Sequence, residues 1–167
     1  MSKRPYSKKK EMTPGKILIL VAIAALLVYF GSTFPKNISA YVPDDILSYS
    51  IKYISDIQTN ENGGYLTGTY KADDQNAVQL SAALAGQMYR KQIFGTNDNT
   101  VDAEGMVEVN LVSSGDNGWF MLRCYSDGTV LISSPKNGDS FKPYRSGWGF
   151  GRNGQQLFRN LLMVFGD

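Results

Sequence analysis

The most prominent feature of the hydrophobic pattern is an uncharged segment near the start of the chain. Residues 17–29 are all apolar or aromatic, and residues 30–34 extend the run to 18 residues without a charge before Pro35 and Lys36. A helix of that length spans roughly 27 Å, close to the thickness of a bilayer core. A core helix of a soluble protein should show a polar face, and this segment has none. We therefore expect a transmembrane helix over residues 16–34, with residues 17–34 in the lipid bilayer.

Charge is distributed unevenly on the two sides of this segment. Six basic residues and one acidic residue lie before Ile17, whereas 11 basic and 14 acidic residues follow from Lys36 onward. The positive-inside rule places such a basic tail, residues 1–15, in the cytoplasm. We expect a single-pass protein in the cell membrane, with a linker over residues 35–45 and its C-terminal domain outside. The net positive charge of the chain therefore comes from the tail beside the apolar segment. We expect no nucleic-acid partner.

A cleaved signal peptide is the competing interpretation of the first forty residues. A basic region followed by an apolar core is also the pattern of a signal peptide, and Ile38-Ser39-Ala40 could serve as a small-residue cleavage site. Either interpretation exports the remainder of the chain. Whether the N-terminal segment is retained stays open at this point.

Residues 46–167 show the periods of strands and helices in alternation. Period-2 alternation predicts strands at residues 48–53, 65–70 and 107–111, with a turn at Asn60–Gly64 between the first two. Asp73 and Asp74 are suited to the start of a helix over residues 74–92, with Arg90 and Lys91 in its last turn and Gly95 as its stop. The next strands are expected at 119–125, 129–133 and 141–144, and Asn153 can cap a final helix. The fold class is therefore α+β, a small antiparallel sheet with two helices packed on it.

The residues that commonly carry chemistry are few in this chain. There is no histidine, so histidine-bound zinc and Ser-His-Asp or Cys-His catalysis are excluded, and the one cysteine, Cys124, alternates with apolar neighbours as a core residue would. Asp73 with Asp74, and Glu104 with Glu108, are the carboxylate pairs that a glycoside hydrolase could use. Residues 98–104 place oxygen ligands at alternate positions but lack the glycine and glutamate of a calcium-binding EF-hand. We expect no catalytic residue, no metal and no cofactor.

The most unusual segment of the domain runs from residue 144 to residue 152. It interleaves aromatic side chains with arginines and three glycines. Aromatic faces can stack on sugars or peptides, and arginines can bind carboxylate or phosphate groups. The alternative is that the aromatic residues pack into the core while the glycines allow a tight passage to the last helix. The possible ligand surface consists of Tyr144, Arg145, Trp148, Phe150 and Arg152.

The domain resembles a group of small exported domains of Gram-positive bacteria, commonly catalogued as domains of unknown function. The features that carry the resemblance are the hairpin before the Asp-rich helix start, the turn Tyr125–Gly128 and the short C-terminal helix. The chain lacks the lipobox cysteine that many of those proteins have. The resemblance implies an anchored α+β domain and no particular site.

These observations predict a non-enzymatic membrane-anchored domain that binds a protein or a cell-envelope component. A carboxylate-based envelope hydrolase or transferase is the alternative from another class. In a third interpretation the chain is an accessory subunit of a larger membrane complex, held through its apolar helix, where Ala22, Ala24 and Ala25 supply small residues for helix packing.

Overall fold

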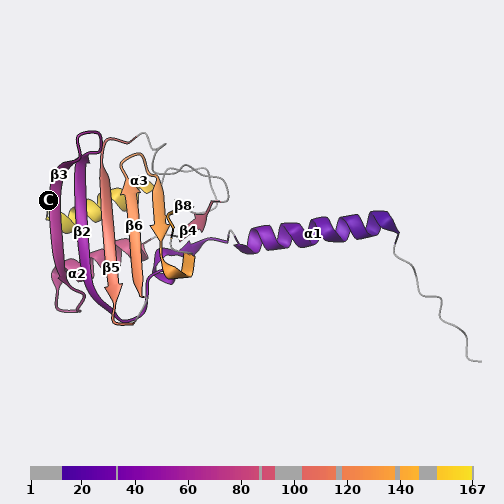
Figure 1. Ribbon diagram of the computed structural model, residues 1–167, viewed down its shortest axis with the longest axis horizontal. Coiled ribbons are helices and arrows are strands. Elements are labelled where there is room, and N and C mark those ends of the chain that lie inside the picture. Colours follow the sequence, from indigo (N-terminus) through magenta and orange to yellow (C-terminus); the bar gives the residue numbers. More distant parts are fainter. Residues whose placement is uncertain are drawn as a thin grey trace, which may run out of the picture. The chain divides into compact units, whose positions relative to one another are not determined.

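A computed structural model describes residues 13–32, 34–86, 88–92, 103–115, 118–137, 140–146 and 154–166. The chain divides into two units, Met1–Ser32 and Thr33–Asp167. The first unit contains a single described helix, and the second contains a sheet and two further α-helices (Figure 1).

Helix α1, Pro14–Ser32, forms the described part of the first unit. Proline is suited to its first turn, where a backbone N–H would have no partner within the helix. The Thr13 carbonyl accepts hydrogen bonds from the N–H groups of Lys16 and Ile17 at 2.8 and 3.3 Å. None of the span Pro14–Gly31 is buried within the structure, and the helix is long and apolar enough to cross a membrane. It begins and ends two residues before the expected range of 16–34.

The second unit is built on one sheet in which all neighbouring strands are antiparallel. The described residues form eight strands in the order β1-β4-β8-β7-β6-β5-β2-β3. Strands β5 to β8 follow one another as a meander, as expected for β5 to β7, and the β2–β3 hairpin extends it beyond β5. The strands are β1 Lys36–Asn37, β2 Ile46–Asp56, β3 Glu61–Thr69, β4 Met88–Lys91, β5 Met106–Ser113, β6 Trp119–Tyr125, β7 Val130–Ser133 and β8 Lys142–Ser146.

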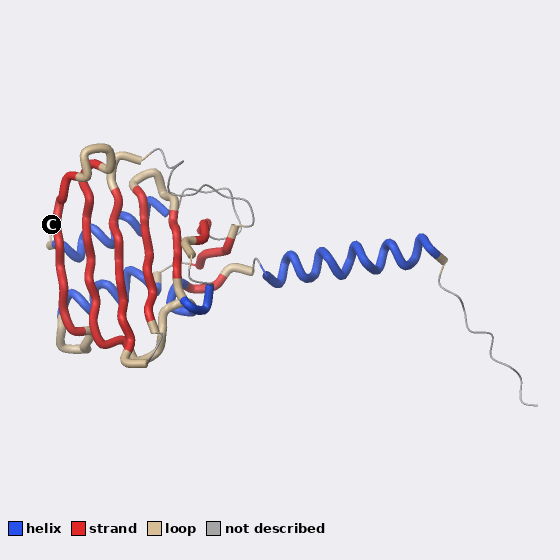
Figure 2. Tube along the Cα trace, in the orientation of Figure 1, coloured by secondary structure: helices blue, strands red, loops and turns tan. Residues whose placement is uncertain are grey.

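Two helices lie behind the sheet, both on the same face (Figure 2). They are α2, Gln75–Ala85, and α3, Gly154–Leu162. Short 3-10 turns occur at Ile38–Ala40, Pro135–Asn137 and Met163–Phe165. The α+β class expected from the sequence is confirmed, with a larger sheet than the pattern indicated.

Strand alternation gives this sheet a covered face and an open face. Side chains of Ile51, Val109 and Leu122 point to the helices and are fully buried in one core cluster with Leu80 of α2 and Leu161 of α3. The intervening residues point the other way. A second, smaller cluster on the open face, at one end of the sheet, consists of Ile54, Met106, Tyr125 and Leu131.

The start of α2 agrees with the sequence pattern, because Asp74 is its N-cap. Its carboxylate accepts hydrogen bonds from the N–H groups of Asn76 and Ala77 at 2.9 and 3.2 Å. The Tyr49 hydroxyl, which comes from β2, donates to the same carboxylate at 3.1 and 3.2 Å. Burial and the neighbouring Asp74 raise the pKa of Tyr49 above its ordinary value, so its hydroxyl stays protonated. The cap thereby ties the helix to the sheet.

The end of α2 differs from the expected helix over residues 74–92. The helix ends at Ala85, and the segment that was expected to be its last two turns is strand β4, which pairs with β1 and β8. Met88 and Tyr89 continue the apolar face of the expected helix. Tyr89 is fully buried, however, between the less buried residues Met88 and Arg90, as the alternation of a strand requires. β4 pairs with β1 and β8, each about 50 residues away in sequence. This pairing favours a strand, although the local sequence favours a helix.

The expected linker over residues 35–45 also differs from the structure. Lys36 and Asn37 pair with β4, and the Asn37 side-chain amide donates to the Ala85 carbonyl at 2.8 Å. Ile38 is fully buried in the main core. These residues therefore belong to the folded second unit. Residues 61–64, expected in a turn, begin strand β3, and the turn occupies residues 57–60.

Close backbone packing at the start of α3 yields a stability prediction. A Cβ atom at Gly154 would overlap the carbonyl group of Gly128, in the turn between β6 and β7. We expect Gly154→Ala to lower the free energy of unfolding by about 3 kcal/mol, because the Cβ atom would displace the Gly128 backbone rather than the end of a flexible side chain. Denaturant unfolding of the full chain measures this change.

Gly86→Ala is the matched control for this substitution. Gly86 follows α2 with φ −71° and ψ −15°, a conformation that alanine adopts freely, and its Cβ would make only ordinary contacts. We expect a change within about 1 kcal/mol, and a stabilising one is consistent with the lower entropy of the unfolded chain. Equal losses in the two variants would show that the Gly128 contact does not limit position 154.

Candidate ligand-binding face

The open face of the sheet is where the described part of the second unit presents side chains that no helix covers. Alternation along β2, β5 and β6 places every second residue of these strands there. Antiparallel sheets commonly have one such solvated face. A binding site on it would stand on rigid strands rather than on loops.

A charged network lies in the middle of this face. Arg123 Nε donates to Glu108 Oε2 at 2.8 Å in an ion pair between neighbouring strands. The Arg123 guanidinium also lies over the Phe141 ring, 4.2 Å from its centroid. The Asn110 amide donates to the other Glu108 oxygen at 3.2 Å. Because its carboxylate is occupied by these two partners, Glu108 serves to hold the strands in register.

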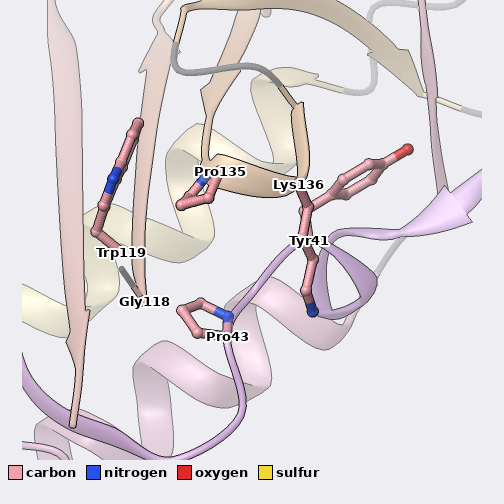
Figure 3. A pocket seen from close by; sticks show the side chains of 6 residues that line it. All are labelled: Tyr41, Pro43, Gly118, Trp119, Pro135 and Lys136. Carbon is pink, nitrogen blue, oxygen red and sulfur yellow. The ribbon is translucent and has the colours of Figure 1, made fainter. Parts of the chain in front are cut away.

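A small apolar cleft lies beside the first residue of β6 (Figure 3). We name it the Trp119 cleft. Figure 3 shows the Trp119 ring on one side, Tyr41 on the other, and two proline rings between them. Its volume is about 80 Å³. It is lined by Tyr41, Pro43, Gly118, Trp119, Pro135 and Lys136.

The walls of the Trp119 cleft come from three separate segments that hydrogen bonds hold together. Ser113 N–H donates to the Gly118 carbonyl at 2.6 Å, which closes the connection from β5 to β6. The Lys136 ammonium donates to the Val42 carbonyl at 3.2 Å and so joins the turn after β7 to the segment before β2. Proline rings add rigidity on both sides. The cleft is therefore formed before any ligand binds.

Tyr41 forms its wall of the cleft against a second tyrosine. The Tyr41 and Tyr144 rings meet edge to face, with centroids 5.1 Å apart. Burial raises the pKa of the Tyr41 hydroxyl, and the hydrogen bond with Tyr144 opposes that shift. Tyr144 itself is only 1% exposed and belongs to the main core. It therefore supports the cleft from behind rather than facing a ligand.

The other residues of the ligand surface expected from sequence are only partly described. The backbone of Arg145 lies in β8, paired with Arg90 of β4. Trp148, Phe150 and Arg152 lie outside the described residues. Sequence reasoning did not identify Trp119 as a cleft residue, because the pattern indicates only that a strand starts there. The one available signal is a large aromatic residue directly after the turn residue Gly118.

The carboxylate pairs proposed for hydrolysis have separate structural positions. Asp74 caps α2, while its neighbour Asp73 is exposed. Glu104 is exposed before β5, and Glu108 is paired with Arg123. In the described ranges, histidine, cysteine and acidic side chains form no group of three or more that could hold a metal. Of the calcium-like segment 98–104, residues 98–102 lie outside the described residues.

Comparisons with protein-family models, curated proteins and solved structures gave no match. The arrangement of the described residues therefore carries the functional argument.

Cys124 provides a prediction about reactivity. Its side chain is fully buried on the covered face, and its sulfur lies 3.5 Å from the Gly154 carbonyl oxygen. Burial raises the pKa of the thiol well above its ordinary value, so the reactive thiolate is scarce at neutral pH. We expect a thiol reagent such as iodoacetamide to leave the folded chain unmodified at pH 7.5 and to label one site after denaturation. Rapid labelling of the folded chain would contradict this arrangement.

Proposed function

We propose that the chain is a single-pass membrane protein with a cytoplasmic N-terminus, whose second unit lies outside the membrane and binds a protein partner of the cell envelope. The apolar surface of α1 supports the anchor, since none of the span Pro14–Gly31 is buried. The basic tail before it supports the orientation. The resemblance to anchored exported domains agrees with both.

The Trp119 cleft is the observation that carries the choice of a polypeptide ligand. A volume of about 80 Å³ is roughly half that of a cavity that accommodates benzene, about 150 Å³. Most small-molecule sites are several times larger, at about 300–1,000 Å³. One aliphatic or proline side chain fits the space, beside the Trp119 ring and the two prolines. A cleft of this kind anchors one residue of an extended peptide segment.

Topology is the first property to test. The full chain, with a C-terminal tag, is expressed in a bacterial host, and its intact mass and the accessibility of the tag to external protease are measured. We expect the full-length mass, extraction only by detergent, and a protease-sensitive tag in spheroplasts. Reversing the tail charge, with Lys8, Lys9 and Lys10 changed to glutamate, is expected to reduce the correctly oriented fraction. A mass shorter by about 40 residues would instead identify a cleaved signal peptide.

Partner binding is tested by placing a photo-crosslinking amino acid at position 119 in cells. Tyr65, which is 60% exposed on β3, is the control position, because it is an aromatic residue on the same sheet away from the cleft. We expect a defined protein adduct from position 119 and none of that mass from position 65.

The identified partner then allows a quantitative measurement. Trp119→Ala should weaken its binding by about 30-fold, as expected for a central aromatic contact, while Tyr65→Ala should leave it unchanged. Identical adducts from the two positions, or an unaffected affinity in Trp119→Ala, would exclude the cleft as the contact site.

A further inference from the structure

A second, more open hollow of about 420 Å³ lies on the open face near the β3 edge of the sheet. It extends across β3, β2 and β5. Strand pairing aligns its side chains in two rows, one through Ser48 of β2 and one through Ser50 of β2. The first row is Thr69, Ser48 and Val112, and the second is Thr67, Ser50 and Asn110. We name these six residues the hydroxyl grid.

The dimensions of the hydroxyl grid follow from strand geometry. Neighbouring strands lie about 4.8 Å apart, and alternate residues on one strand lie about 6.7 Å apart. The grid therefore covers roughly 10 Å by 7 Å. It presents four hydroxyl groups and one amide over that area. Each hydroxyl can donate one hydrogen bond and accept two.

The four hydroxyl groups of the grid are unused by the protein itself, whereas the Asn110 amide nitrogen donates to Glu108. Within the described residues, the hydroxyls of Ser48, Ser50, Thr67 and Thr69 make no hydrogen bond, and Asn110 Oδ1 is enclosed without a partner. Some hydroxyls elsewhere are used internally: the Thr129 hydroxyl donates to Asp127 at 3.0 Å, and the Ser126 hydroxyl accepts from Gly105 N–H at 3.2 Å. The four grid hydroxyls belong to residues that are exposed or half-buried, so a ligand can reach them.

The charge of the grid limits what it can recognise. No charged side chain lines the hollow itself. In the next row along β2, Lys52 lies opposite Glu108, which is paired with Arg123, so the charged groups border the grid on one side only. A phosphate or carboxylate ligand would find no counter-charge within the hollow. At one corner Val112 is 50% exposed and pairs in register with Trp119. That corner offers an apolar surface beside the hydroxyls.

We infer that the hydroxyl grid is a binding site for a neutral oligosaccharide, such as the uncharged glycan chains of a cell surface. Sugar hydroxyls match the grid because both sides donate and accept, and the C–H face of a sugar ring suits the Val112 and Trp119 corner. The grid is about the size of two sugar units. This site is distinct from the Trp119 cleft, although Trp119 contributes to the border between them.

The test uses the full chain in lipid nanodiscs and a set of fluorescently labelled neutral tetrasaccharides: β-1,4-linked glucose, N-acetylglucosamine and mannose, and α-1,4-linked glucose. Fluorescence anisotropy gives each dissociation constant. We expect at least one of these sugars to bind with a dissociation constant of about 1 mM or lower. Thr67→Val and Ser50→Ala should each weaken that binding about fivefold, because each removes one hydrogen-bonding hydroxyl.

Ser81→Ala is the matched control, since it makes the same change at an exposed serine of α2. We expect it to bind as the original chain does. Valine is well accepted in strands, so Thr67→Val should fold, and thermal unfolding verifies this for each variant. The inference is overturned if none of the tetrasaccharides binds, or if the two grid variants bind as tightly as Ser81→Ala. Because Ser50 and Thr67 do not line the Trp119 cleft, failure of the two grid variants leaves the crosslinking result at position 119 independent.

Discussion

Covering one face of the sheet is the constraint on which the rest of the second unit depends. With a single cysteine, the chain has no internal disulfide to hold it, so the apolar side chains of β2, β5, β6 and β7 must be covered by packing alone. Two helices do this. The Tyr49–Asp74 hydrogen bond fixes the start of α2, and the backbone contact between Gly128 and Gly154 fixes the start of α3.

The same constraint explains why the opposite face is available for binding. Both helices and the main core lie on one side, which leaves the strands β2, β5 and β6 uncovered on the other. The Glu108–Arg123 pair and the stacked Phe141 cover part of this open face. The Trp119 cleft and the hydroxyl grid lie on either side of the Val112–Trp119 pair. Rigid strands thus present an apolar and a polar candidate surface next to each other.

Local sequence patterns were sufficient for most individual elements. Strand β6 has the predicted bounds, Asp74 caps α2 as expected, and the apolar helix lies within two residues of its predicted range. Patterns failed where long-range pairing decides the structure. Tyr89 satisfies both a helical stripe and a strand alternation, and only its neighbours β1 and β8 select the strand. Ile38 sits beside a proline-rich segment that resembles a linker, yet it fills the core.

The candidate site was harder to predict for a related reason. Tyr41, Trp119 and Pro135 are far apart in sequence and share no motif, so only the fold brings them to one cleft. The sequence pattern indicates Tyr144 as a ligand-facing residue because it begins the aromatic and arginine-containing segment 144–152. In the structure its ring packs against Tyr41 instead. The hydroxyl grid illustrates the same limit, because isolated Ser and Thr residues on two strands carry no signal until the register of those strands is known.

The place of β1 in the sheet has a consequence for the order in which the chain can fold during synthesis. This first strand pairs with β4, and the other neighbour of β4 is β8, so this edge of the sheet is completed only after residue 146 has been made. Helix α3, which covers β5 and β6, is later still. A growing chain therefore lacks part of its core until almost its full length has emerged. In the proposed topology, this late completion would favour passage of an unfolded chain through a translocation channel, with folding completed on the far side.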